Sequence, residues 1–538
     1  MKGWLLALLL PGLVAGAADT GPGVTRCERP SVPAPERERP FAGELQRTLE
    51  ALVRAEFTRE PHAGLAVGVL RGGERWVGTY GSRDLERGLP ATPRTTWRLA
   101  SLTKSLTAVA VMQLVEQGRL ELDADIRTWV PAWPPKRWPV TVRQLLGHLG
   151  GVTNYGRWGP SHDTGPLDTA GAVGLVAGYE LEAEPGTRFI YSTWAYNLLG
   201  AAIEAASGQG YGAYLQEHVF GPAGMEHAAL DERSTRDEHQ AAGYRLREGR
   251  RVPSKVIDVS GRFAGGGTRA SIEDLLGFGR ALLDHRLVSR ESTALMQTPM
   301  STREGQLTDY GMGFATWPYR GHYVVAHSGA QPETSTLLLL VPGEDVAIVL
   351  ASNVEGQAVM LRHLASSIVE LLLEPGGARE SAHLRDEVDA VVNQGLGRVF
   401  NYGLAYYVWA TRGPGTLPTG RDGLPEAFAQ VDQLLDRTTI ARAPEAARAR
   451  ILSAHEPREH AVFIQVGVQM ARTLEEALGP ERLRTYSARG ALAFFNDYLT
   501  VCEAKACPDP FRFDEGLRSN VRRFAAGGRS PQAASPGR

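Results

Sequence analysis

Residues 99–118 read LASLTKSLTAVAVMQLVEQG. Ser101 and Lys104 stand three residues apart, so on a helix both side chains lie on one face, within reach of each other. The positions that follow are apolar nearly all round, which predicts a buried helix that ends at Gly118. A buried lysine loses its charge readily, and its neutral amine can then accept a proton from a serine. The segment therefore predicts a nucleophile and its base.

The alternative for this segment is a serine that caps a helix and a lysine that extends outward to water. The apolar character of the helix weighs against that alternative, and so does the composition. Basic residues in this chain are almost all arginines, and an arginine could not serve as the base because it stays protonated. The lysines of the whole chain are Lys2, Lys104, Lys136, Lys255 and Lys505.

Several segments in order along the chain resemble the serine β-lactamase-like and penicillin-binding-protein family. Leu99–Lys104 looks like the first motif of this family. Thr141–Val152 resembles its segment T-x-R-x-L-L-x-H-x-S-G, with Gly150 where serine is usual. The segments 118–126 and 265–275 also fit, and the three glycines at 265–267 predict a tight turn. The similarity is to the class C-type branch, which includes the mitochondrial serine β-lactamase-like protein.

The resemblance covers about residues 42–374 and implies an acyl-enzyme serine hydrolase, with Ser101 as nucleophile and Lys104 as its proton acceptor. It also implies the fold, which is the α+β fold of β-lactamases and transpeptidases. We expect an antiparallel sheet flanked by helices, built from about residues 42–100 and 257–374, with a helical insertion between these stretches.

Tyr191 begins the segment that fits the Y-x-N motif of the family. A phenol near the serine can carry a proton to the leaving group or help the lysine. Thr193 stands where asparagine is usual, and the chain has no Y-x-N anywhere. An asparagine amide can donate a hydrogen bond to a substrate carbonyl, whereas threonine offers one shorter hydroxyl. The departure therefore concerns substrate positioning and not the nucleophile.

The third motif of the family, K-T-G or H-x-G, fits His327-Ser328-Gly329. The triplets that begin at His62 and His148 match H-x-G as well. We choose His327 because apolar strands are predicted on both sides of it, at residues 323–325 and 337–341.

The family resemblance implies an oxyanion hole formed by the backbone N–H groups of Ser101 and Ala330. Gly329 would let the substrate backbone approach closely. Histidine at 327 is mostly neutral at pH 7, unlike the lysine of K-T-G, so the fixed cation for a substrate carboxylate is missing. We therefore expect poor β-lactamase activity and a broader range of amide or ester substrates.

The N-terminus has the pattern of a secretory signal peptide over residues 1–17, with one lysine, a short apolar run and small residues before the cleavage point. The run is shorter than the ~20 residues that span a bilayer. We expect an exported protein, periplasmic or secreted, without a stable membrane span after cleavage. Export would allow a disulfide between Cys502 and Cys507, which leaves Cys27 alone.

Outside the hydrolase region the sequence predicts a disordered linker at 18–41, a mostly helical C-terminal domain at 378–524 and a disordered tail at 525–538. Strands are predicted at 64–70, 74–80, 322–326, 334–341 and 346–352. Helices are predicted at 43–57, 101–117, 357–374, 463–478 and 483–501, with a further helix capped by Ser271.

These features predict a peptidase or amidase that acts on small or cell-wall-type peptides. Two alternatives remain, namely a carboxylesterase with the same residues and a non-hydrolytic binding or scaffold protein that uses residues 378–538 for a partner. No metal or organic cofactor is expected. With a net charge of −2 the chain has no large basic field that would bind nucleic acid.

Overall fold

The computed structural model describes residues 38–59, 62–155, 165–232, 238–373, 384–416, 423–453, 461–504, 507 and 511–526. The predicted signal peptide, Cys27, most of the predicted linker and the tail beyond residue 526 lie outside these residues. All of these described residues belong to one compact unit. The domain boundary near residues 374–378 therefore stays a prediction.

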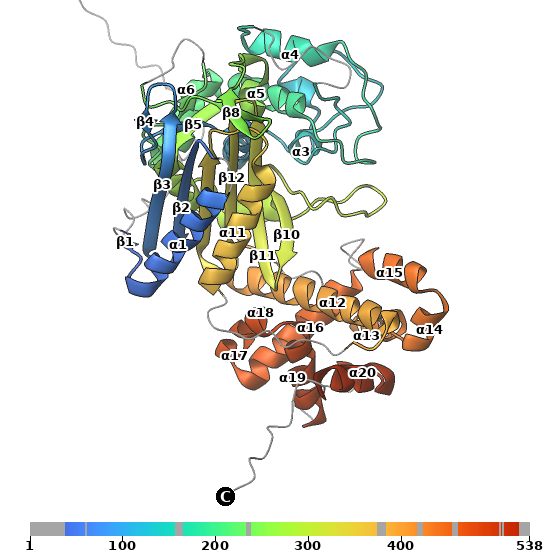
Figure 1. Cartoon of the computed structure of the whole chain (residues 1–538). Coiled ribbons are helices and arrows are strands. Elements are labelled where there is room, and N and C mark those ends of the chain that lie inside the picture. Colours follow the sequence, from blue (N-terminus) through green and yellow to red (C-terminus); the bar gives the residue numbers. More distant parts are fainter. Residues whose placement is uncertain are drawn as a thin grey trace, which may run out of the picture. The chain divides into compact units, whose positions relative to one another are not determined.

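A central sheet forms the middle of the hydrolase region, and its strands come from two separate stretches of the chain (Figure 1). The described residues contribute eight strands in the order β1-β3-β2-β13-β12-β11-β10, with β4 beside β3. All neighbours pair antiparallel except β1 and β3. The strands are β1 (Arg39–Pro40), β2 (Gly64–Arg71), β3 (Glu74–Asp84), β4 (Leu89–Pro90), β10 (Ala315–Tyr319), β11 (His322–Gln331), β12 (Thr334–Val341) and β13 (Val346–Ser352).

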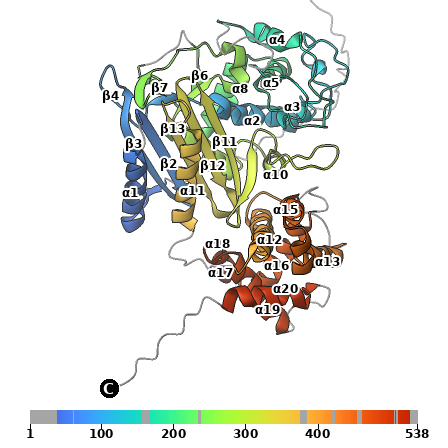
Figure 2. The ribbon, with the colours of Figure 1, turned by 45° about the vertical axis from the view of Figure 1, so that its right-hand side comes forward.

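Helices cover both faces of this sheet (Figures 1 and 2). α1 (Gly43–Arg59) and α11 (Ala358–Leu373) lie on one face, and α9 (Ile272–Leu283) lies on the other. Alternate positions of a strand point to opposite faces. Val67 accordingly packs beneath α1 and α11, while its neighbour Ala66 belongs to the core on the other side. The predicted α+β class and the two stretches that build the sheet are confirmed.

The insertion between the two stretches carries most of the remaining helices of the hydrolase region. It begins with the 3-10 turn η1 (Ala100–Leu102) and α2 (Thr103–Glu116). It is not wholly helical as predicted, because short strands pair within it and with its borders. Its further elements are α3 (Val142–Leu146), α4 (Thr169–Ala177), α5 (Thr193–Ser207), α6 (Tyr211–Leu215), α7 (Gly221–Ala223), β6 (Ala229–Leu230) and the hairpin β7 (Tyr244–Arg247) and β8 (Arg250–Pro253). The first stretch also contains β5 (Thr96–Arg98), and the second also contains α8 (Phe263–Gly266), β9 (Thr268–Ser271), which pairs with β5 and β6, and α10 (Arg290–Gln297).

The C-terminal region is helical, as predicted. The predicted helix at 483–501 is wrong, because three helices occupy it and Gly490, at φ 87°, ends the second of them. No helix in the described ranges is both long and apolar enough to cross a bilayer. The helices are α12 (Glu387–Arg412), α13 (Leu424–Leu434), α14 (Arg437–Arg442), α15 (Pro444–Ser453), α16 (Val462–Leu478), α17 (Pro480–Arg484), α18 (Tyr486–Arg489), α19 (Ala491–Glu503) and α20 (Glu515–Ala526).

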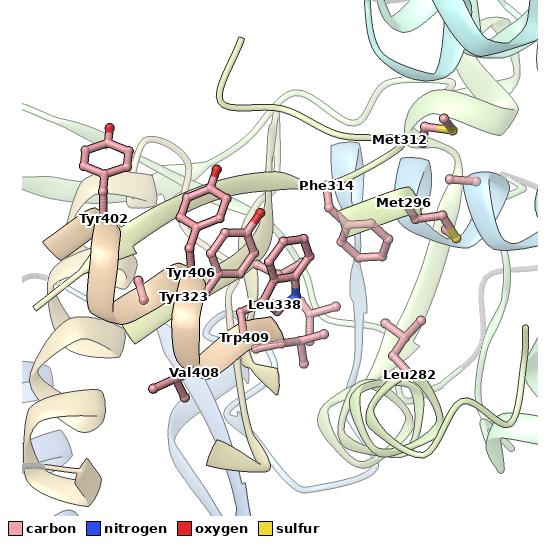
Figure 3. Close-up of a cluster of buried hydrophobic side chains, with 14 of the residues drawn as sticks. Leu282, Met296, Met312, Phe314, Tyr323, Leu338, Tyr402, Tyr406, Val408 and Trp409 are labelled. Carbon is pink, nitrogen blue, oxygen red and sulfur yellow. The ribbon is translucent and has the colours of Figure 1, made fainter. Parts of the chain in front are cut away.

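Helix α12 packs against strand β11, and aromatic side chains of the two elements contact one another (Figure 3). The rings of Tyr323 and Trp409 stack with centroids 4.2 Å apart, and Tyr406 meets both rings edge-on. The Tyr323 hydroxyl donates to the backbone oxygen of Gln297 at 2.7 Å. Such aromatic pairs contribute beyond the area they bury. The C-terminal helices are thus anchored on the strand that also carries His327.

The structure corrects three further predictions about local structure. Arg39–Pro40 pair with Glu74–Arg75, so a strand begins inside the predicted linker, and Phe41 is buried. Residues 265–267 do not form a turn of their own, because α8 extends to Gly266. The helical region continues through Ala526, two residues into the predicted tail.

Candidate active site

Ser101 lies in the 3-10 turn η1, just before the buried helix α2. Ala100, immediately before it, has φ 49°, a conformation that is strained for a residue with a Cβ. The backbone here is fixed from strand β12, where the hydroxyl of Thr336 donates to the backbone oxygen of Leu99 at 2.9 Å. Strain held in place by its surroundings is common at active sites.

Lys104 is completely buried at the first turn of α2, and its amine meets three oxygens. Nζ lies 2.7 Å from the backbone oxygen of Gly265, 3.1 Å from Ser101 Oγ and 3.2 Å from Thr193 Oγ1. Burial, with a smaller contribution from the charge of Arg262, lowers the pKa of Lys104 well below its usual value. A neutral amine has two protons to donate and one lone pair, so it can bind two of these oxygens and accept the proton of Ser101.

The side chain of Tyr191 lies close enough to Ser101 for the serine hydroxyl to influence the pKa of the phenol. The ring centroid lies 4.8 Å from Lys104 Nζ. Burial raises the pKa of the Tyr191 hydroxyl, so the group stays protonated at neutral pH. A protonated phenol is suited to the first of the two expected roles, which is to carry a proton to the leaving group.

The turn that carries Tyr191 is held by its neighbour Ser192, the N-cap of α5. The Ser192 hydroxyl donates to the backbone oxygen of Thr153 at 2.7 Å, and the Ser192 N–H donates to His148 Nδ1 at 3.2 Å. Thr193 then enters the first turn of α5 with its hydroxyl at Lys104. The capped helix thus places two predicted site residues next to the lysine.

Strand β11 supplies the opposite wall of the site. β10 pairs with β11 only as far as Ala326, and η1 packs against β11. Ala330 is exposed at this edge of the sheet. A Cβ at Gly329 would lie 2.0 Å from the backbone oxygen of Leu99. Glycine at 329 is therefore required by contact with the chain before Ser101, a reason that differs from the predicted approach of substrate.

His327 is buried in β11 and neutral. Its Nδ1 lies 2.7 Å from the backbone oxygen of Ser328, which can only accept, so Nδ1 carries the proton. Nε2 is left to accept from the Tyr310 hydroxyl at 2.9 Å. Burial, followed by the charge of Lys104, lowers the pKa of His327 to about 3. This side chain provides no cation at neutral pH.

Sequence reasoning missed an aromatic cluster next to these residues. The buried ring of His148 meets the rings of Tyr191, Tyr196 and Tyr310 at centroid distances of 4.3, 5.3 and 4.9 Å. His148 was noted only as part of a motif, and Tyr310 lies outside every predicted element. No periodicity or spacing in the sequence marks Tyr310 as a residue of the site, because its partners His148 and His327 are close to it in the fold but distant along the chain.

The fold and this arrangement of serine, buried lysine and tyrosine define a serine hydrolase of the β-lactamase and transpeptidase fold. The chain belongs to the Beta-lactamase family, whose model matches residues 49–373. This confirms the resemblance that the sequence motifs indicated.

Individual proteins in the family are similar to this chain at moderate identity. The mitochondrial serine beta-lactamase-like protein LACTB of Homo sapiens is 27% identical over 413 residues, covering 59% of this chain and 75% of that protein. Protein flp of Staphylococcus aureus (strain MRSA252) is 25% identical over 345 residues, covering 61% and 67%. The structure of the octameric penicillin-binding protein homologue from Pyrococcus abyssi has a TM-score of 0.54 and 27% identity, covering 61% of this chain and 77% of that chain.

Proposed function

We propose that this hydrolase cleaves amide bonds of small or cell-wall-type peptides through an acyl-enzyme on Ser101. The observation that carries the proposal is the buried Lys104 amine, 3.1 Å from Ser101 Oγ, with its pKa lowered by burial. An amine of that kind removes the serine proton at neutral pH without a histidine. The similarity to a penicillin-binding protein homologue supports peptides as the substrate class.

In the proposed mechanism the lone pair of Lys104 takes the proton of Ser101 as Oγ attacks the carbonyl carbon. The N–H groups of Ser101 and Ala330 stabilise the negative oxygen that forms. Tyr191 donates its proton to the leaving nitrogen as the amide bond breaks, and the proton on Lys104 restores the phenol. Water then attacks the ester of Ser101, which releases the acid and returns a proton to Oγ.

Because His327 is neutral, we propose that the site binds a free substrate carboxylate weakly. This supports low activity on β-lactams, in which such a carboxylate is needed for binding. D-amino-acid amides compared with short-chain p-nitrophenyl esters separate the amidase from the esterase. Faster turnover of the esters alone would favour a carboxylesterase, and efficient cephalosporin hydrolysis would contradict the proposed weak carboxylate binding.

We expect a fluorophosphonate to add one label to the purified chain and none to its Ser101→Ala variant, as measured by intact mass. The reagent reacts only with an activated serine, and the variant has no Oγ to form the bond. A penicillin adduct that persists would also support cell-wall peptides as substrates. If the wild-type chain took up neither reagent, the binding or scaffold alternative would replace the enzyme.

We also expect the rate of labelling to rise with pH and to level off well below about pH 10, where an exposed lysine titrates. Only the neutral amine accepts the serine proton. Because burial lowers the pKa of Lys104, this amine becomes neutral at a lower pH than the amine of an exposed lysine does. Stopped assays over a pH series measure this. A rate that is still climbing at the pKa of an exposed lysine would contradict the role of Lys104.

We propose that the protein is exported, on the strength of the N-terminal pattern. The disulfide between Cys502 and Cys507 supports an oxidising compartment. We also propose that the surface of the C-terminal helices is available to a partner, since a reaction on Ser101 gives them no chemical role. Periplasmic and culture-medium fractions, probed with an antibody to the chain, test the location.

A further inference from the structure

Asn154 contacts Thr193, the residue that stands where the Y-x-N motif has its asparagine. The Thr193 N–H donates to Asn154 Oδ1 at 3.0 Å. A backbone N–H can only donate, so the amide oxygen faces Thr193 and Nδ2 points away from it. Within the described part of the chain, Nδ2 makes no hydrogen bond, and the side chain is half-buried.

The backbone that precedes Asn154 is fixed by two sets of contacts. The Thr153 hydroxyl donates to Glu182 Oε1 at 2.6 Å, and the Thr153 backbone oxygen accepts from Ser192 at 2.7 Å. Gly151 has φ 69°, and a Cβ there would lie 2.2 Å from the backbone oxygen of Ala183. Asn154 is thus held in place before any substrate binds, which reduces the entropy lost on binding.

The hydroxyl of Thr193 cannot easily replace the missing amide. It already meets Lys104 Nζ at 3.2 Å, and it is short. The amide of Asn154 reaches the same region through its contact with the Thr193 backbone, and its two N–H protons remain to be donated.

We propose that Asn154 Nδ2 donates a hydrogen bond to a carbonyl oxygen in the acyl part of the substrate, one residue before the scissile bond. The inference rests on the proposed function. In that mechanism the reacting oxygen is bound by Ser101 and Ala330 and the leaving group by Tyr191. We place the acyl substituent on the side of Thr193, whose hydroxyl lies 3.2 Å from Lys104 Nζ and whose N–H is bound by Asn154. The substrate class is then an N-acylated amino acid, as in a peptide, and not a simple fatty acyl group.

Two esters of equal acyl length test this on the full-length chain: ethyl N-acetylglycinate, which carries the extra carbonyl, and ethyl pentanoate, which lacks it. The measured quantity is kcat/KM for ethyl N-acetylglycinate divided by kcat/KM for ethyl pentanoate. Loss of one hydrogen bond should lower this ratio by about tenfold in Asn154→Asp. This variant keeps the acceptor for the Thr193 N–H and removes the donor, but it also adds a negative charge. Asn154→Leu removes the donor without adding charge and should lower the ratio as well.

The matched control is Asn401→Asp. Asn401 Oδ1 accepts a backbone N–H from Gly321 at 3.1 Å, so the chemical change is the same, but this residue lies in α12. The control should keep the wild-type ratio. An unchanged ratio in both Asn154 variants overturns the inference, as does a wild-type chain that takes up the fluorophosphonate yet hydrolyses neither ester. If the wild-type chain neither hydrolyses an ester nor takes up the fluorophosphonate, the proposed function itself fails.

Discussion

Replacement of Lys104 by methionine is expected to lower kcat/KM by about 10⁴-fold, as removal of the base does in other serine hydrolases. Methionine fills a similar buried volume but has no lone pair basic enough to take the proton of Ser101. Lys104→Arg should lose as much activity, because a guanidinium stays protonated. Steady-state hydrolysis and fluorophosphonate labelling both measure the loss.

Lys136→Met is the control for this substitution. Lys136 is half-buried and its Nζ donates to the backbone oxygen of Ala177 at 2.7 Å, so the same chemical change is made in a lysine that does not contact Ser101. Activity should stay within about twofold of wild type. If Lys104→Arg retained activity, the lysine would act as a charge and not as a proton acceptor.

Replacement of Arg98 by methionine is expected to lower the free energy of unfolding by about 3–5 kcal/mol, the usual cost of removing one partner from a buried ion pair. Arg98 Nε lies 2.7 Å from Asp231, and Nη1 lies 2.6 Å from Glu333. All three side chains are buried, so the substitution leaves two carboxylates without their guanidinium. Urea unfolding followed by circular dichroism measures the change.

Arg143→Met provides the comparison for Arg98. Arg143 forms two hydrogen bonds with Asp123, but that carboxylate is exposed, and such pairs contribute about 1 kcal/mol or less. Adding Asp231→Asn and Glu333→Gln to Arg98→Met should recover part of the stability, because the buried charges are then removed. Equal losses in the two single variants would contradict the structural role of Arg98.

Much of the fold could be predicted from the sequence, because the patterns that indicate its strands and helices lie within short segments of the chain. Strand β12 ends in a continuous apolar run at residues 337–341, and α9 starts at a capping box formed by Ser271 and Asp274. The errors also have local causes. Gly490 breaks a pattern of apolar residues that reads as one helix, and β1 is a two-residue strand that exists only through its pairing with β3. Pairing of this kind leaves no periodicity in the strand itself.

The sequence by itself determined that Ser101 and Lys104, which we propose as nucleophile and base, lie next to each other, because they are three residues apart and local geometry brings them together. It also marked Tyr191 and His327 as motif residues. Only the tertiary structure showed three hydrogen bonds at the site. They join Lys104 to the backbone oxygen of Gly265, His327 to the hydroxyl of Tyr310, and the N–H of Thr193 to the side chain of Asn154. These contacts join segments that are far apart in the chain, and only the packing of α2, α5, α8 and β11 decides which atoms meet.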